Sequence, residues 1–172
     1  MKKIMFSDAF CLMQAVLAGT KTMTRRLLRD NVPLGNWEET KKHLPYKVGE
    51  IIAIAQSYYT IGKTQYDKFG NGVPGNSNKM FTRAELMPHH IRITDIKVER
   101  LQSISDEDIL KEGVWQYPKL RAYHVSKATG FAPDVAFLTA REAFAYLIDR
   151  ISGRGTWGSN PWVVAYSFEL VD

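Results

Sequence analysis

The order in which strand-like and helix-like segments follow one another constrains the fold of this chain most. Hydrophobic periodicity predicts strands near residues 3–6, 22–27, 51–55, 90–101 and 162–171, and helices near residues 8–18, 105–113 and 139–152. The resulting order is β-α-β-β-β-α-α-β, and no βαβ unit repeats in it. We therefore predict an α+β fold, in which a mixed or antiparallel β-barrel carries helices on its outside, and not a doubly wound parallel sheet.

Capping residues predict where the helices begin and end. Ser7 is expected to cap the first helix, and Gly19 to end it, because a left-handed residue at a helix C-terminus costs glycine little. Ser105 and Asp108 have the spacing of a capping box ahead of a short acidic helix. Thr139 is the expected cap of the last helix, whose apolar residues form one stripe.

The chain has 172 residues, a length that suits one domain spanning 1–172. Three stretches rich in glycine, proline and charge are expected to be long loops, near 28–47, 60–79 and 115–136. The first of these has a helical pattern around Trp37–Lys42. Long loops in a compact domain are usually functional or mobile, so each of them bears on the site.

The net charge and the cysteine count indicate which partners, metal sites and cellular compartment to expect. A net charge of +5 favours contact with polyanions such as RNA. With Cys11 as its one cysteine, the chain cannot form an internal disulfide or a thiolate metal cluster, and a reducing, cytoplasmic location is expected. No apolar run approaches the roughly 20 residues of a membrane span. No spacing of histidine and acidic residues is typical of a metal site, so we predict no metal, no cofactor and no membrane partner.

The segment from Gly153 to Gly158 matches G-x-G-x-x-G letter for letter. A dinucleotide site needs this motif between a strand and a helix, whereas here it follows a helix and precedes a strand. We therefore interpret it as a flexible link into the last strand.

The strongest candidate for a functional segment is the basic, threonine-rich strand after Gly19. Thr22, Thr24 and Arg26 share one face of this strand, and Lys21 lies at the turn before it. The residues alone leave two interpretations open, a solvated strand end or the wall of a basic pocket. In a pocket, burial would lower the pKa of Lys21, and a nearby threonine could then act as a nucleophile.

Four separated segments resemble the ASCH-domain family, whose members share a PUA-like fold. Gly19-Thr20-Lys21-Thr22-Met23-Thr24-Arg25-Arg26 is similar to the family's G-x-K-T-x-T-x-R signature, and the other matching segments are 46–50 with the strand after it, 104–113, and 160–170. Together these segments cover most of the chain in order. The long loops resemble additions expected in a bacterial or prophage member.

The resemblance implies a cleft beside the signature that binds RNA, a nucleotide or a modified nucleoside. Some small bacterial members are amidohydrolases that remove the acetyl group from N4-acetylcytidine. The catalytic lysine, threonine and glutamate of those enzymes correspond to Lys21, Thr24 and Glu112, with Glu107 as a less favoured alternative to Glu112. This chain departs from those enzymes at Arg25, where an apolar residue is common, and in its greater length.

Further residues are predicted to bind the ligand. The candidates to hold phosphates are the basic residues Lys21, Arg25, Arg26 and Arg83. The candidates to stack on a base are the aromatic residues Tyr58, Tyr59, Trp157 and Trp162. Most aromatic residues, however, fill protein cores. Gln56 and Ser57 end the central strand and are placed to read a base edge. The last two predicted ligand-binding residues are Thr22 and Asn160, which lie in the segments that resemble the ASCH-domain family.

Three functions follow as hypotheses. The first is a non-catalytic module that binds RNA, a nucleotide or a modified nucleoside. The second is an amidohydrolase acting on acylated cytidine. The third is a phage-type accessory protein whose basic surface binds a protein partner.

Overall fold

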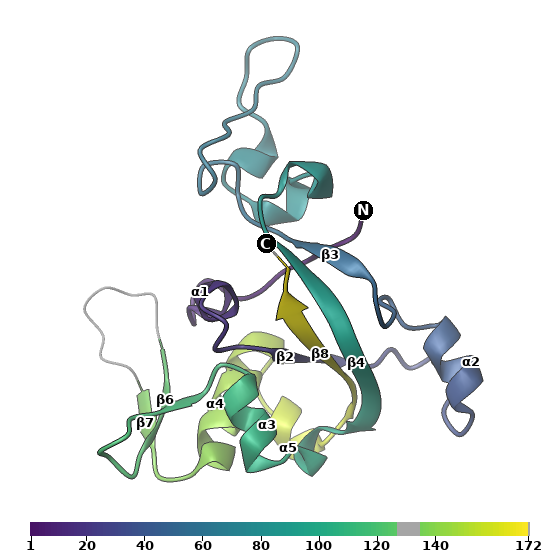
Figure 1. The fold of residues 1–172 in the computed structure, drawn as a ribbon, viewed down its shortest axis with the longest axis vertical. Helices are drawn as coiled ribbons and strands as arrows, with labels where there is room; N and C mark the ends of the chain where they lie inside the picture. Colours follow the sequence, from purple (N-terminus) through teal and green to yellow (C-terminus); the bar gives the residue numbers. More distant parts are fainter. Residues whose placement is uncertain (127–134, 172) are drawn as a thin grey trace.

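The computed structural model describes residues 1–126 and 135–171, and a five-stranded mixed sheet lies at its centre (Figure 1). The strand order is β1 (Lys3–Ile4), β3 (Ile51–Ile54), β4 (His90–Arg100), β8 (Trp162–Leu170) and β2 (Met23–Leu27). The pair β1–β3 is parallel and the other pairs are antiparallel. The predicted α+β class with a mixed sheet is therefore confirmed.

The sheet has two edge strands, β1 and β2. Within the described residues, no strand pairing joins them, so hydrogen bonding does not close the sheet into the expected barrel. A side chain spans the gap instead, because the guanidinium of Arg26 on β2 donates to the carbonyl of Met5, just after β1. We call this gap the seam.

Helices cover the sheet, and a second, smaller sheet lies beside them. The helices are α1 (Leu12–Leu17), α2 (Trp37–Lys42), α3 (Asp106–Lys111), α4 (Ala140–Ser152) and α5 (Thr156–Ser159). The small sheet consists of β5 (Trp115–Gln116), β6 (Tyr123–Val125) and β7 (Val135–Phe137), and it packs on α4 (Figure 1). None of the helices in the described part of the chain is both long and apolar enough to cross a membrane.

The main core forms because β3 and β4 turn apolar residues toward the helices. Ile52, Ile54, Ile91 and Ile93 are completely buried there. The apolar stripe predicted for the last helix packs against the same core, with Ala143, Phe144, Leu147 and Ile148 buried. Burial of this apolar area is the main force that holds α4 beside the sheet.

Local capping predictions are confirmed for α4 and α3. Thr139 and Glu142 form a complete capping box at α4, and Ser105 accepts a hydrogen bond from the amide of Asp108 at α3. The helical turn expected at Trp37–Lys42 is α2. The predicted cap at Ser7 is wrong, because the chain first turns through Cys11 with φ 54°, and α1 begins only at Leu12.

Two predicted loops contain regular structure. The stretch 115–136 was expected to be a loop, but its described residues supply strands to the small sheet. The G-x-G-x-x-G segment contains the short helix α5, and the carboxylate of Asp149 accepts the amides of Gly155 and Trp157. It is therefore not the flexible link that the sequence suggested.

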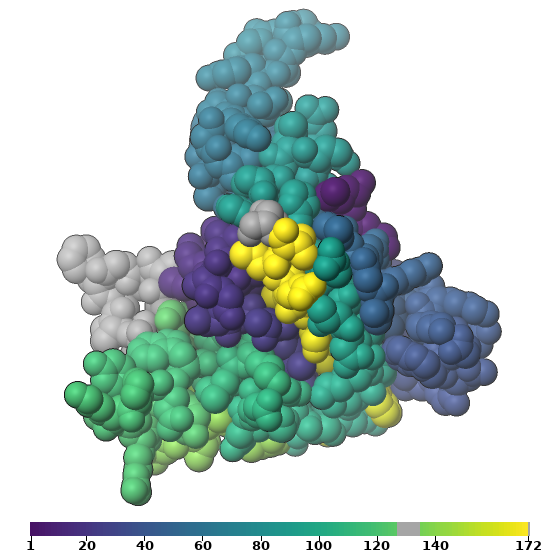
Figure 2. All heavy atoms as spheres, in the orientation of Figure 1, coloured from purple at the N-terminus to yellow at the C-terminus, as the bar shows by residue number. Residues whose placement is uncertain are grey.

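The loop predicted at 60–79 belongs to a projection that we call the arm, residues 57–87, which stands away from the rest of the molecule (Figures 1 and 2). The arm contains the 3₁₀-helices η1 (Pro74–Asn76), η2 (Lys79–Phe81) and η3 (Ala84–Leu86); a fourth, η4 (Leu101–Ser103), follows β4. It has a small core of its own, in which Tyr58, Ala84 and Met87 pack against Ala53 of β3.

Candidate functional site

Lys21 is buried at the end of the turn that follows α1. Gly19, with φ 73°, lets the chain reverse, and the amides of Thr20 and Lys21 both donate to the carbonyl of Ala15. The Lys21 side chain then points inward, with an exposed fraction of only 2%. Its Nζ donates to the carbonyls of Met23 and Glu112, each at 2.7 Å, and to Glu112 Oε2 at 2.9 Å. All three ammonium protons are thus used.

Glu112 caps the C-terminus of α3 and is as buried as Lys21. While Oε2 accepts from Lys21, Oε1 accepts from Arg25 Nη1 at 2.9 Å. Gly113 follows with φ 105°, and a Cβ placed there would lie 2.6 Å from a methyl carbon of Leu12 and 3.6 Å from Cδ of Lys21. Glycine is therefore required to bring the end of α3 this close to Lys21.

Arg25 links this pair to a wider ion network. Its guanidinium is completely buried, and Nη2 donates to Glu99 at 2.7 Å and to Asp108 at 3.1 Å. Lys97 of β4 in turn donates to Asp108 at 3.0 Å. The network alternates positive and negative charge, which offsets the cost of removing these groups from water.

The electrostatics of the network follow from burial and pairing. Burial lowers the pKa of Lys21, and the carboxylate of Glu112 opposes that change without cancelling it. For Asp108, burial raises the pKa, but the hydrogen bonds from Lys97 and Arg25 outweigh it and hold the pKa below its usual value. Burial also lowers the pKa of Arg26, which nevertheless stays charged near neutral pH.

The network forms the polar side of a cavity of about 330 Å³ at the seam, which we call the Lys21 pocket. Lys21, Thr24 and Glu112 all line it, as do Arg25 and Arg26. The opposite wall is apolar and comes from α4, through Phe144, Leu147, Ile148 and Ile151. The hydroxyl of Thr24 makes no hydrogen bond to any described residue, so it is available to a ligand.

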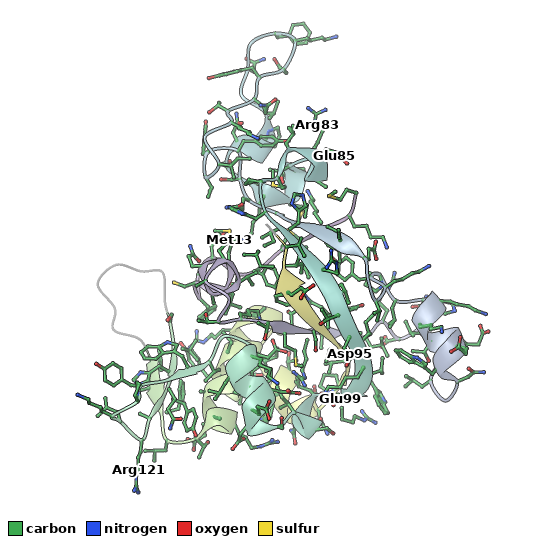
Figure 3. The ribbon with its side chains drawn as sticks, in the orientation of Figure 1. Met13, Arg83, Glu85, Asp95, Glu99 and Arg121 are labelled. Atoms are coloured by element: carbon green, nitrogen blue, oxygen red, sulfur yellow. The ribbon has the colours of Figure 1, made fainter. Side chains whose placement is uncertain are left out.

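The ligand-binding residues predicted after β3 lie outside the Lys21 pocket. Gln56 is buried, and its Oε1 has no partner in the described structure. Ser57 bonds with Thr60 in a turn, and Tyr58 is buried in the arm, where its hydroxyl accepts the amide of Arg83. The Arg83 side chain lies on the arm, far from Glu99 (Figure 3).

The remaining predicted residues also have other surroundings. Thr22 precedes β2, and its carbonyl accepts the amide of Phe168. The Asn160 side chain accepts the amide of Gln102, and Trp162 stacks under the guanidinium of Arg100 at 4.7 Å. Arg25 lines the pocket, but its guanidinium is occupied by carboxylates and does not present a free charge for phosphate.

Sequence reasoning missed two parts of the site. It did not identify Glu99 and Asp108 as partners of Arg25, although both lie in charged patterns that were noted for their secondary structure. It treated the stripe on α4 only as core, whereas one end of that stripe walls the pocket. The available signal was an apolar stripe that continues to Ile151, beyond the buried residues.

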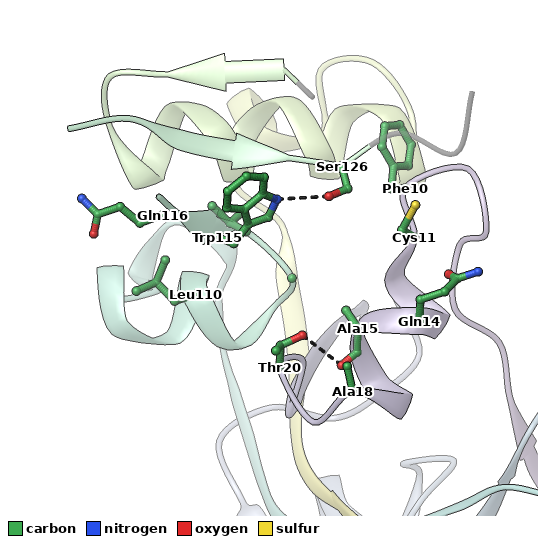
Figure 4. Close-up of a pocket in the computed structure, with 12 residues that line it drawn as sticks. Phe10, Cys11, Gln14, Ala15, Ala18, Thr20, Leu110, Trp115, Gln116 and Ser126 are labelled. Carbon is green, nitrogen blue, oxygen red and sulfur yellow. Dashed lines mark hydrogen bonds between the residues drawn. The ribbon is translucent and has the colours of Figure 1, made fainter. Parts of the chain in front are cut away.

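A second cavity, of about 620 Å³, lies on the other side of α1 (Figure 4). It is bounded by Phe10, Cys11 and Gln14 on one side and by Trp115 on the other. The indole of Trp115 donates to Ser126 at 3.1 Å, and Thr20 donates to the carbonyl of Ala15. Among the described residues, no charged side chain lines this cavity, and no cluster of histidine, cysteine and acids could hold a metal ion.

Known proteins resemble this chain in structure and not in sequence. No family model and no curated protein matches it. Similar solved structures include a protein of Enterococcus faecalis from the family DUF984, with 17% identity, a TM-score of 0.47, and coverage of 100% of this chain and 81% of the other. They also include an ASCH domain from Lactobacillus crispatus, with 14% identity, a TM-score of 0.43, and coverage of 96% of this chain and 75% of the other. With identities and TM-scores this low, neither likeness says what the chain binds.

Proposed function

We propose that the Lys21 pocket binds a nucleoside, either free and modified or as part of RNA. The observation that carries this proposal is the pairing of a buried polar side, with the free hydroxyl of Thr24, and an apolar wall on α4. An apolar wall suits the flat face of a base, and hydrogen-bonding groups opposite it suit the base edge. The resemblance of Gly19–Arg26 to the ASCH signature supports the same ligand class.

The size and charge of the pocket agree with this ligand. Small-molecule pockets usually have volumes of about 300–1,000 Å³, and this one is near the lower limit. A buried lysine, glutamate and arginine contribute little to stability compared with apolar residues of similar volume. Their presence at the floor of a pocket is therefore better explained by a ligand than by the needs of the core.

Calorimetric titration with cytidine, uridine and N4-acetylcytidine tests the proposal. Thr24→Val removes the hydroxyl but keeps the shape, and should weaken binding about 2- to 10-fold, the net value of one hydrogen bond. Thr22→Val is the matched control, since Thr22 is two residues away on the same segment but does not line the pocket. Equal affinity of both variants and wild type would place the ligand elsewhere.

Amide hydrolysis is a second candidate, favoured by the convergence of Lys21, Thr24 and Glu112 on one pocket. In this scheme Thr24 Oγ1 bonds to the amide carbon and gives its proton to an uncharged Lys21 amine. Lys21 passes that proton over 2.9 Å to Glu112, which protonates the departing amine as the C–N bond breaks. Water then hydrolyses the acyl-threonine.

The scheme requires the network to rearrange. The ammonium of Lys21 donates all three of its protons and both oxygens of Glu112 are occupied, so Lys21 must first give up one contact and lose that proton to solvent before it can accept the proton of Thr24. This is why binding, and not turnover, is the first proposal. Release of cytidine from N4-acetylcytidine, lost about 100-fold or more in Lys21→Met, would establish hydrolysis, and the rate should increase with pH because the uncharged amine is the base.

A further inference from the structure

The tip of the arm holds aromatic rings in solvent. The exposed fractions of Tyr59, Tyr66 and Phe69 are 61%, 66% and 77%. No contact joins any of these rings to another ring of the described structure, and the one cation over them is that of Lys68, on Phe69. Burying an aromatic side chain stabilises a fold by about 1.5–3 kcal/mol. In the eleven residues from Tyr59 to Phe69, three such side chains stay exposed and do not contribute this free energy.

The tip is fixed by its own hydrogen bonds and is not a loose loop. The carboxylate of Asp67 accepts the amides of Phe69 at 2.8 Å and Asn71 at 2.9 Å. Tyr66 pairs with Gly72, and the Asn76 side chain bonds to both the amide and the carbonyl of Gln65. The backbone that carries Tyr66 and Phe69 is therefore ordered in advance, which lowers the entropy that a partner would have to overcome.

The excess of basic residues on the arm favours a negatively charged partner. Residues 57–87 contain four basic residues, Lys63, Lys68, Lys79 and Arg83, and two acids, Asp67 and Glu85. Asp67 is used inside the tip, and Glu85 pairs with the N-terminal ammonium. Within the described structure Lys63 and Arg83 form no ion pair, and Lys68 Nζ lies 4.9 Å from the centre of the Phe69 ring. Basic side chains without an ion pair, close to exposed rings, fit a strand of stacked bases linked by phosphates.

The base of the arm connects this surface to the Lys21 pocket. Lys79 of η2 donates to the carbonyl of Phe6 and, at 2.7 Å, to Asp8. Phe6 itself lines the pocket. The base of the arm is therefore bonded directly to a residue that lines the pocket.

We propose that the arm is a docking surface for single-stranded RNA. Bases stack on Tyr66 and Phe69, and Lys63, Lys68 and Arg83 hold the phosphates. The inference deepens the proposed function and rests on it in one respect, namely that the docked strand presents one of its nucleosides to the Lys21 pocket.

Fluorescence anisotropy with a labelled oligouridylate of about 12 nucleotides tests the docking. The double variant Tyr66→Ala/Phe69→Ala should bind at least about 10-fold more weakly, since each base stacked on a ring is worth about 1–3 kcal/mol. The matched control is Tyr117→Ala/Leu120→Ala, which removes two exposed apolar side chains elsewhere, 48% and 55% exposed. The control should bind like wild type, and thermal unfolding should be unchanged in both.

Salt dependence tests the charge contacts separately. Lys63→Gln/Lys68→Gln should reduce the slope of log affinity against log salt by about 1.4, or about 0.7 for each phosphate contact. Lys41→Gln/Lys42→Gln, on α2, is the control with the same change in net charge and should keep a steeper slope.

The two proposals fail in different ways. If arm variants bind the oligonucleotide as tightly as wild type, or wild type does not bind it at low salt, the docking surface is overturned, and a protein partner becomes the alternative for the arm. If arm variants lose RNA affinity while wild type binds no free nucleoside, docking is supported and the pocket proposal fails. If both are correct, arm variants keep nucleoside affinity and lose RNA affinity.

Discussion

Among single residues, Glu112 has the most demanding surroundings, because one buried carboxylate accepts from both Lys21 and Arg25. Glu112→Gln leaves these two cations without their shared countercharge, and should lower the free energy of unfolding by about 3–5 kcal/mol. Urea unfolding at neutral pH measures this. Glu107→Gln is the control: its side chain is 80% exposed and pairs with no described residue but Lys111, so its effect should stay within about 0.5 kcal/mol. Equal effects would mean that the network contributes no stability.

Asp108 gives the network a dependence on pH. Its pKa in the folded protein lies below the usual 3.8, so the carboxylate stabilises the fold fully above that pH, and the contribution is lost as pH falls through the folded pKa. The stability difference between wild type and Asp108→Asn should therefore shrink as urea unfolding is repeated from neutral pH to below 3.8. A difference that stays constant would show that the stabilisation does not come from the charge.

At the scale of elements, α4 both fills the core and walls the pocket, so its N-terminal cap matters to the site. Thr139→Ala removes one half of the capping box and should cost about 1 kcal/mol of stability. Ser159→Ala is a suitable control, because within the described structure that exposed hydroxyl donates to the carbonyl of Thr156 inside α5 and to no residue of α4. Chemical denaturation of the two variants beside wild type measures the difference. An equal, small effect of both would indicate that α4 is held by packing alone.

Helices and strands whose own residues carry a capping pair or a hydrophobic period could be predicted from the sequence. Elements that lack such a local pattern could not. Thr139 and Glu142 cap α4 through residues three positions apart, and the alternation of 90–101 is that of β4. The left-handed turn at Cys11 has no such signal, because cysteine seldom adopts φ above zero. The strands β5, β6 and β7 are two or three residues long and exist only through pairing with one another.

The same distinction holds for the site. Lys21 and Glu112 are 91 positions apart, so the contact between them followed from resemblance to a family and not from any local pattern. The burial of Tyr58 could not be predicted from the sequence either, because an aromatic residue after a strand can face a ligand or fill a core. Here Gly75 lies against the Tyr58 ring, so closely that an added Cβ would come within 2.7 Å of it.

At the scale of the whole molecule, the tip of the arm is separate from the main core. Within the described structure, residues 63–72 form hydrogen bonds only to other residues of the arm. Replacing residues 66–72 by two glycines should therefore change the free energy of unfolding by no more than about 1 kcal/mol. Calorimetric unfolding checks this, and the affinity of the Lys21 pocket for a nucleoside should be unchanged. A large loss of stability would show that the tip supports the main core.

The seam has a consequence for how the molecule behaves at high concentration. Unpaired strand edges invite a second chain to add a strand, which is the usual first step of β-aggregation. Here one edge reaches the other through Arg26, and residues of α4 border the cavity between them. The contact that links the two edges therefore lies in the lining of the Lys21 pocket itself. The shape of the Lys21 pocket is therefore restrained by the need to avoid aggregation as well as by ligand binding. A wider pocket would separate β1 from β2 and expose both strand edges at once.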